Sequence, residues 1–266
     1  MPVRAREDLE RLRAALAKAG LETQDRRERA ALGHAAADRA LKGGLARGAL
    51  HEVFAQAGHE TAATGFAAVL CARLAGARPV LWIRQDYCAL EFGELAATGL
   101  LELGLDPSRF LLLRAAHAQD ALKAASDALS CAALGAVVIE LSGSPRILDL
   151  TASRKLTLSA ATTNVPVLLL RFAAEPEANG AETRWLVRAA RSDPYVDNWG
   201  VDNWGRPVFE AELIRNRHGG TGCWVMEWCC DSGTCREPAA DRGAVVPASF
   251  DRPAAAALGA DRRSAA

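Results

Sequence analysis

Short apolar runs alternate with helix-like segments along the middle of the chain, and this alternation constrains the fold more than any other feature. The apolar runs have the length and the Gly, Pro or charged boundaries of buried strands, and they lie at residues 49–54, 79–83, 110–113, 136–140 and 165–170. Segments of helical periodicity or composition lie between them, at 60–75, 89–103, 116–134 and 147–162. Such βαβ units predict a parallel sheet with helices on both faces, a doubly wound domain from about residue 45 to 172.

The pattern changes after residue 172. Three more strands are expected, at 184–190, 207–217 and 223–228, and the turn composition of Asn216–Gly222 predicts an antiparallel hairpin between the last two. From Asp231 onward large apolar side chains are few, which is typical of a disordered tail. The predicted organisation is an N-terminal helical arm (1–42), an α/β domain (43–230) and a disordered tail (231–266).

Size and charge narrow the class of protein. A chain of 266 residues, half of them hydrophobic, can bury a large two-sided core. Its 32 basic and 32 acidic residues balance, so there is no general attraction to nucleic acid or to an anionic membrane. No apolar run reaches the roughly 20 residues of a membrane helix, and the charged N-terminus is unlike a signal peptide. We therefore expect a cytoplasmic protein.

Two features stand out as candidate surfaces for a protein partner. Leu9, Leu12 and Leu16 form an apolar stripe on a predicted helix at 7–19, which is either a solvated face or a docking arm. The pentapeptide Val-Asp-Asn-Trp-Gly occurs twice in succession and contains Trp199 and Trp204. It has the appearance of a slippage duplication in a loop, and the alternative is a pair of exposed Trp anchors at an interface.

The seven cysteines favour structural roles. Three stand singly in apolar segments and are expected to be small buried residues: Cys71, Cys88 and Cys131. Four gather near the end of the chain: Cys223, Cys229, Cys230 and Cys235. Their spacings of six, one and five differ from the paired spacing of zinc ligands, so no metal site is expected.

The connection between the first strand and the first helix lies where nucleotide-binding α/β domains hold phosphate. That task requires free backbone N–H groups, a Lys for the β/γ-phosphates and a Ser or Thr hydroxyl for magnesium. The connection includes the segment Gly58-His-Glu-Thr-Ala-Ala-Thr-Gly65, and the chain has no Lys between Lys42 and Lys123. A bound triphosphate would therefore lack its usual countercharge.

This segment resembles the phosphate loop of RecA proteins, Gly-Pro-Glu-Ser-Ser-Gly-Lys-Thr. In that register Ala63, Thr64 and Gly65 replace the second Gly, the Lys and the hydroxyl residue. Loss of the Lys and the hydroxyl together should remove several kcal/mol of transition-state stabilisation. The resemblance implies a RecA-like fold with a vestigial nucleotide cleft, made of Gly58, Glu60, Thr61, Thr64, Gly65, Asp86 and Glu140.

Asp86 and Glu140 belong to that cleft because both follow or end a predicted strand. Asp86 falls where RecA proteins have a catalytic Glu, and Glu140 where they have a magnesium-linked Asp. Arg171 and Phe172 stand where the family has a nucleotide-sensing polar residue. We interpret the carboxylates as relics and expect no catalytic residue and no cofactor. An acid/base or metal role, and weak nucleotide binding or ATPase activity, remain as alternatives.

DNA contact is a separate question. RecA-type proteins use the loop after the last parallel strand, and here the loop Ala173–Glu182 has three Glu and no basic residue. Because phosphate contact requires cations, this loop is not expected to bind DNA. The N-terminal arm and the segment Arg215–His218 are the alternatives for direct DNA binding, which we expect to be weak or absent.

Three segments resemble the ImuA family more specifically: Leu50-His-Glu-Val-Phe54, Trp82-Ile-Arg-Gln-Asp86 and the hairpin from Arg215 to Trp228. The resemblance implies a non-catalytic adaptor in SOS-induced translesion synthesis and mutagenesis. Its implied partners are an ImuB-like inactive Y-family polymerase, an error-prone DnaE-type polymerase complex and RecA.

Two other functions stay open at this point. A SulA-like cell-division inhibitor, which binds the tubulin-like division protein, also resembles a RecA domain without a phosphate loop, but SulA proteins are shorter. An enzyme that uses the strand-end carboxylates is the other, although Ser142, Ser144 and His51 lack the context of a nucleophile elbow.

Overall fold

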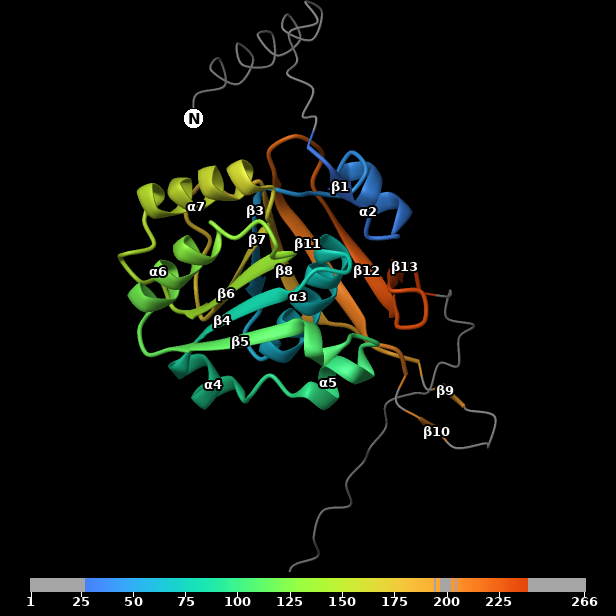
Figure 1. Cartoon of the computed structure of the whole chain (residues 1–266). Coiled ribbons are helices and arrows are strands. Elements are labelled where there is room, and N and C mark those ends of the chain that lie inside the picture. Colours follow the sequence, from blue (N-terminus) through green and yellow to red (C-terminus); the bar gives the residue numbers. More distant parts are fainter. Residues whose placement is uncertain (1–26, 194, 197–201, 204, 239–266) are drawn as a thin grey trace, which may run out of the picture.

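The computed structural model describes residues 27–193, 195–196, 202–203 and 205–238 (Figure 1). Its centre is one large sheet. Six of its strands run parallel: β3 (Leu50–Ala55), β4 (Val80–Gln85), β5 (Phe110–Ala115), β6 (Ala136–Ser142), β7 (Val167–Phe172) and β8 (Thr183–Ala189). The five strands predicted from apolar runs are among them, which confirms the predicted parallel sheet.

An antiparallel part continues the sheet beyond β8. It consists of β11 (Val208–Asn216), β12 (Gly222–Cys229) and β13 (Thr234–Arg236). The strand order of the nine-stranded sheet is β13-β12-β11-β8-β3-β7-β6-β4-β5. The β11–β12 hairpin confirms the turn predicted around residues 216–222.

The prediction of a disordered tail from residue 231 is wrong for β13. Cys235 is buried, and its backbone N–H donates to the carbonyl of Leu32 at 2.8 Å. Backbone hydrogen bonds to β12 and to Leu32 hold this short strand together with the one small buried side chain of Cys235, so the low apolar content of the segment gave no sign of it.

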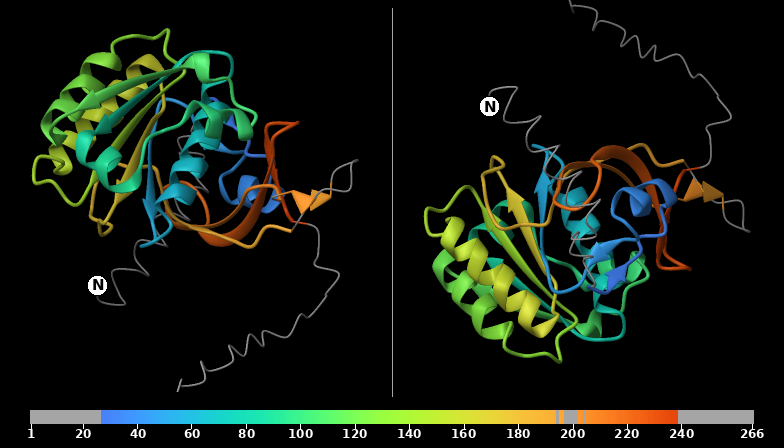
Figure 2. Two further views of the ribbon diagram at one scale, coloured as in Figure 1. Left: turned by 90° about the horizontal axis from the view of Figure 1, so that it is seen from below. Right: turned by 90° about the horizontal axis from the view of Figure 1, so that it is seen from above.

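Helices cover the two faces of the parallel strands, as predicted (Figure 2). On one face α3 (Glu60–Ala75) buries Phe66 and Leu70 in a cluster with Trp185. On the other face lie α6 (Ala118–Ala128) and α7 (Leu150–Thr163). Each face thus has its own apolar core, and the sheet separates them.

The helix predicted at 89–103 is wrong as a single element. The chain forms two short helices there, α4 (Asp86–Phe92) and α5 (Ala97–Glu102). Gly93 ends α4 with a φ of +83°, a conformation that side-chain-bearing residues rarely adopt. The 3₁₀ turn η1 (Pro107–Arg109) then leads into β5.

β5 is not the buried strand that its apolar sequence predicts. Leu111, Leu112 and Leu113 are 52%, 46% and 40% exposed. The reason is the position of β5 in the sheet: among the described residues it is the last strand, and β4 is its one strand partner.

The described part of the predicted arm packs against the domain. It contains β1 (Arg29–Ala30) and α2 (Ala35–Ala40), and β1 forms a two-stranded ribbon with β2 (Leu45–Ala46). Leu32 and Leu41 are buried in the α3-side core. A second small ribbon joins β9 (Tyr195–Val196) and β10 (Asp202–Asn203). Five residues proposed for partner binding lie outside the described residues: Leu9, Leu12, Leu16, Trp199 and Trp204.

The cysteine predictions are confirmed for Cys71 and Cys88, which are buried, and wrong for Cys131, which is exposed in a turn after α6. Within the ranges that the structure describes, all seven thiols are free, and no group of His, Cys, Asp or Glu could hold a metal ion. None of the described helices is long and apolar enough to cross a membrane.

Candidate functional site

The connection from β3 to α3 is a tight turn. The backbone N–H of His59 donates to the carbonyl of Gln56 at 2.9 Å, and that of Gln56 donates to Val187 on β8 at 3.0 Å. Gly58 has a φ of +81°, which the turn requires. The backbone groups that a phosphate-binding loop would present to a ligand are partly used here to close the turn.

Helix α3 begins at Glu60, before the three positions 63–65 at which the phosphate-loop residues are replaced. The N–H of Ala63 already donates to the His59 carbonyl at 3.1 Å. Thr64 and Gly65 follow inside the helix, so their N–H groups belong to its hydrogen-bond ladder. Thr64 turns its hydroxyl back to the Glu60 carbonyl, 3.0 Å away. None of these three residues therefore presents a free amide or hydroxyl at the mouth of the loop.

A carboxylate occupies part of the remaining space. Glu60 Oε1 accepts a hydrogen bond from the backbone N–H of Gly58 at 3.2 Å. A negative side chain in the first turn is stabilised by the helix dipole. The same charge would repel an incoming phosphate, and the phosphate would have to displace it from Gly58. Thr61 lies beside it in the first turn and is exposed.

Gly65 is a packing residue. A Cβ atom at this position would lie 3.5 Å from the ring of Phe209 on β11. Phe209 and Trp185 both meet Phe66 edge to face, with ring centroids 5.6 Å apart in each pair. The start of α3 is therefore fastened to the antiparallel part of the sheet.

Asp86 starts α4 and lies in a surface ion pair. Its Oδ1 accepts from Arg114 Nε at 2.8 Å, and Arg114 also contacts Glu94 Oε1 at 2.6 Å. The hydrogen bonds to Asp86 and Glu94 raise the pKa of Arg114. Asp86 is therefore held by Arg114 on β5, the strand next to β4.

Glu140 is wholly buried on the α3 side of β6. Its two oxygens accept from Trp82 Nε1 and Arg84 Nε on β4, each at 2.8 Å. Burial raises the pKa of the Glu140 carboxyl, and the charge of Arg84 acts in the opposite direction. Because both oxygens are occupied by donors, Glu140 links two strands and cannot also hold magnesium without breaking that link.

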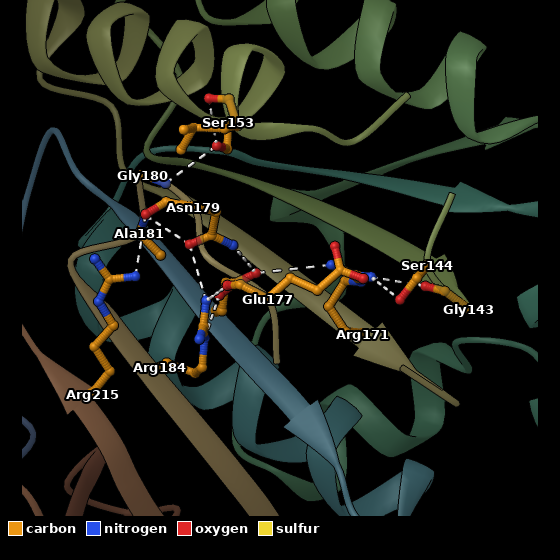
Figure 3. A network of polar contacts seen from close by, with 12 residues as sticks. Gly143, Ser144, Ser153, Arg171, Glu177, Asn179, Gly180, Ala181, Arg184 and Arg215 are labelled. Atoms are coloured by element: carbon orange, nitrogen blue, oxygen red, sulfur yellow. Dashed lines mark hydrogen bonds and ion pairs between the residues drawn. The ribbon is translucent and has the colours of Figure 1, made fainter. Parts of the chain in front are cut away.

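A second polar cluster, which the sequence analysis did not identify, lies on the opposite face (Figure 3). Glu52 on β3 is fully buried. It accepts from Arg184 Nε at 2.7 Å and from Asn179 Nδ2 at 2.6 Å, and Arg171 Nη1 lies 3.9 Å away. Arg171, predicted to replace a nucleotide sensor, donates instead to the Gly143 carbonyl at 2.9 Å.

This cluster exists because the loop 173–182 runs across β3. The loop joins β7 to β8, which flank β3 in the sheet, and it makes this crossover without a helix. Gly180 N–H donates to Ser153 Oγ on α7 at 3.2 Å, which fixes the loop over the α7 face. The only sequence signal was a pair of charged residues, Glu52 and Arg171, inside otherwise apolar strands.

The acidic loop is tied to the domain at its end. Glu182 is buried and forms ion pairs with Arg27 and Arg29. The segment Arg215–His218 is the described alternative for direct DNA binding. Its Arg215 donates to the Asn179 carbonyl at 3.2 Å, whereas Arg217 and His218 are exposed at the tip of the hairpin.

The residues considered for nucleophilic catalysis have structural roles. His51 is buried between Thr183 Oγ1 and the Ala46 carbonyl, each 2.8 Å from a ring nitrogen, and burial lowers its pKa. The Ser142 N–H donates to Gln85 Oε1, and Ser144 Oγ accepts from Arg171. These contacts assemble no nucleophile–base pair among the three.

Comparison with known proteins finds relatives of this chain. No protein-family model matches the chain. The chain is similar to Protein ImuA from two strains of Caulobacter vibrioides. Each alignment is 32% identical over 202 residues and covers 70% of this chain and 77% of the relative. The similarity therefore spans most of both proteins.

Proposed function

Since the chain belongs to the ImuA family, we propose that it is a non-catalytic, RecA-like accessory protein of DNA-damage-induced mutagenesis. It takes part in translesion synthesis by binding other proteins, and its nucleotide cleft is a relic. The order of β3, turn, α3 and the parallel strands that follow supports the RecA-like assignment.

The observation that carries the proposal is the state of the β3–α3 turn. The three residues at the Gly, Lys and hydroxyl positions lie inside α3, and Glu60 takes the amide of Gly58. A phosphate clamp needs free N–H groups and a cation at this place. The turn offers a carboxylate instead, so ATP turnover is not expected.

The two strand-end carboxylates support the same conclusion. Asp86 is paired with Arg114, and Glu140 is paired with Arg84 and Trp82. A general base or magnesium ligand must be able to reach its substrate or metal. Both groups are committed to contacts between strands or helices of the fold.

The partners that we propose are an ImuB-like inactive Y-family polymerase, a DnaE-type error-prone polymerase complex and RecA. Direct binding of DNA by the loop 173–182 is not part of the proposal, because its buried Glu182 is already paired and its exposed residues include Glu175 and Glu177.

The proposed lack of ATP turnover is tested on the purified full-length chain. ATP hydrolysis is measured with and without single-stranded DNA, and ATP binding is measured by calorimetry. The proposal expects no turnover in either condition. Hydrolysis that Asp86→Ala abolishes would contradict it and would favour the ATPase alternative.

The partner part is tested in the cell. The tagged full-length chain is recovered after DNA damage, and the co-purifying proteins are identified by mass spectrometry. The proposal expects an ImuB-like protein and polymerase subunits. Recovery of the tubulin-like division protein in their place would contradict it and would favour the SulA-like alternative.

A further inference from the structure

Exposed apolar side chains gather at the β5 end of the sheet. The described residues contain ten large exposed hydrophobic side chains, and six of them lie between residues 86 and 115. Five of the six are Tyr87 and Leu90 on α4 and Leu111, Leu112 and Leu113 on β5. The sixth is Leu101 on α5, a helix whose end packs toward β12, since the carbonyls of Glu102 and Leu103 accept from Cys230 and Trp228. Single exposed apolar residues are normal, but such a concentration at one place marks a binding surface.

The backbone of β5 is also open. β5 is the last of the nine strands and pairs only with β4, so alternate N–H and C=O groups along its outer edge have no strand partner in the described part of the chain (Figure 1). Proteins usually protect such an edge with Lys, Pro or a very short strand. β5 has six residues, and none before Arg114 is charged or Pro.

The surroundings of this edge are acidic. Residues 86–128, which form α4, α5, β5 and α6, contain seven acidic and three basic side chains, whereas the whole chain is balanced. Arg114 pairs with Asp86 and Glu94, which leaves five acidic residues and two basic ones, Arg109 and Lys123, in this part of the chain. Glu91 is exposed on α4, and Asp120 and Asp127 are exposed on α6, which packs against β5.

We propose that the β5 edge binds an extended apolar segment of another protein, flanked by Arg or Lys, which adds to the sheet as a tenth strand. Main-chain hydrogen bonds to β5 supply affinity, and alternate side chains supply specificity. Leu111 and Leu113 are on the α6 side of the sheet and Leu112 is on the α4 side, so the segment needs apolar residues on both faces. The acidic side chains near β5 favour a segment that has Arg or Lys at its ends.

A second copy of this chain fits the edge less well. Antiparallel pairing of two β5 strands would match Leu with Leu, but it would also bring the acidic surroundings of both copies together. Like charges placed face to face across an interface are costly. The charge of the surface therefore favours a different partner.

The test uses the full-length chain and a labelled peptide, Arg-Arg-Thr-Val-Thr-Leu-Val-Val-Arg, followed by fluorescence anisotropy. A second peptide has Glu in place of each Arg. We expect the Arg-flanked peptide to bind at least ten times more tightly than the Glu-flanked one. We also expect Leu112→Glu to weaken its binding at least tenfold, and hydrogen exchange to show new protection of β5 in the complex.

Leu158→Glu is the matched control, because Leu158 is 69% exposed on α7, away from the edge. It should leave peptide binding unchanged, and thermal melts should show that both variants are folded. Three results would overturn the proposal: no binding of the Arg-flanked peptide, equal loss in both variants, or protection outside β5. Protection of β5 without peptide, with a concentration-dependent doubling of mass, would identify a second copy as the occupant and also overturn it.

Discussion

Arg84 and Glu140 form a buried ion pair between β4 and β6, with 2.8 Å between Nε and Oε1. Both side chains are at most 3% exposed. The pair occupies the place where the family resemblance implies a magnesium-linked acid, and it turns that position into a link between strands.

Removing Glu140 should be strongly destabilising. Glu140→Ala leaves the Arg84 charge and the Trp82 N–H buried without this partner, and breaking such a pair costs about 3–5 kcal/mol. Urea denaturation measures the loss as a lower midpoint with an unchanged slope. The double variant Arg84→Met with Glu140→Leu should be more stable than Glu140→Ala. Arg188→Ala, which removes a surface ion pair, should change stability little.

The buried His51 should make stability depend on pH. Burial lowers its pKa in the folded protein, so the unfolded chain binds a proton first as the pH falls below about 6.5. Its contribution to stability is therefore fully present above that pH and declines as the pH decreases towards the folded value. The free energy of unfolding of His51→Gln, measured from pH 8 to 5, should decline less than that of the wild type. Parallel curves for the two proteins would show that His51 does not titrate in this way.

Restoring the phosphate-loop residues alone should not restore nucleotide chemistry. The triple variant Ala63→Gly, Thr64→Lys, Gly65→Thr keeps Glu60 at the turn and places extra atoms against Phe209. A Cβ at Gly65 alone would meet the Phe209 ring at an ordinary contact distance of 3.5 Å, but the methyl and hydroxyl groups of Thr extend beyond it, and overpacking costs about 1–3 kcal/mol. Calorimetry should detect no tight ATP binding, and thermal melts should show a lower midpoint. Single-residue Gly65→Thr is the control that separates the packing effect from the other two changes.

Asn179 should hold the crossover loop in place. Its side chain donates to Glu52 and accepts from Ala181 N–H and Arg184. Asn179→Ala removes all three contacts, so a glutamate-specific protease should cut after Glu177 faster than in the wild type, with β3 and β8 still paired. Thr162→Ala, an exposed change on α7, should leave the cleavage rate unaltered. Equal cleavage of both variants and the wild type would mean that the loop is held by other contacts.

The sequence predicted the strands and helices well where local pattern decides the outcome. Apolar runs located β3, β4, β6 and β7 because buried parallel strands need apolar side chains on both faces. The same rule failed for β5, since a run of Leu residues does not state whether a strand is central or at the edge. One glycine, Gly93, divided a helix whose surrounding composition suggested continuity.

The residues that the candidate site lacks could be predicted from the sequence, but the contacts that its remaining residues make could not. The missing Lys and the exchanged residues at 63–65 could be seen in the chain. The local backbone conformation decides that α3 begins at Glu60. It also brings the Glu60 carboxylate to the N–H of Gly58. The pairing of Glu52 with Arg184 joins residues 132 positions apart, which no local pattern encodes.

The position of β3 in the sheet has a consequence for how the chain folds as it is made. Its two neighbours, β7 and β8, come more than a hundred residues later in the sequence. At ribosomal rates of about 5–20 residues per second, β3 waits on the order of ten seconds for its partners. During that interval Glu52 has no Arg184, and α3 has only part of the sheet to pack on. The centre of the finished sheet is therefore among the last parts of the nascent chain to be completed.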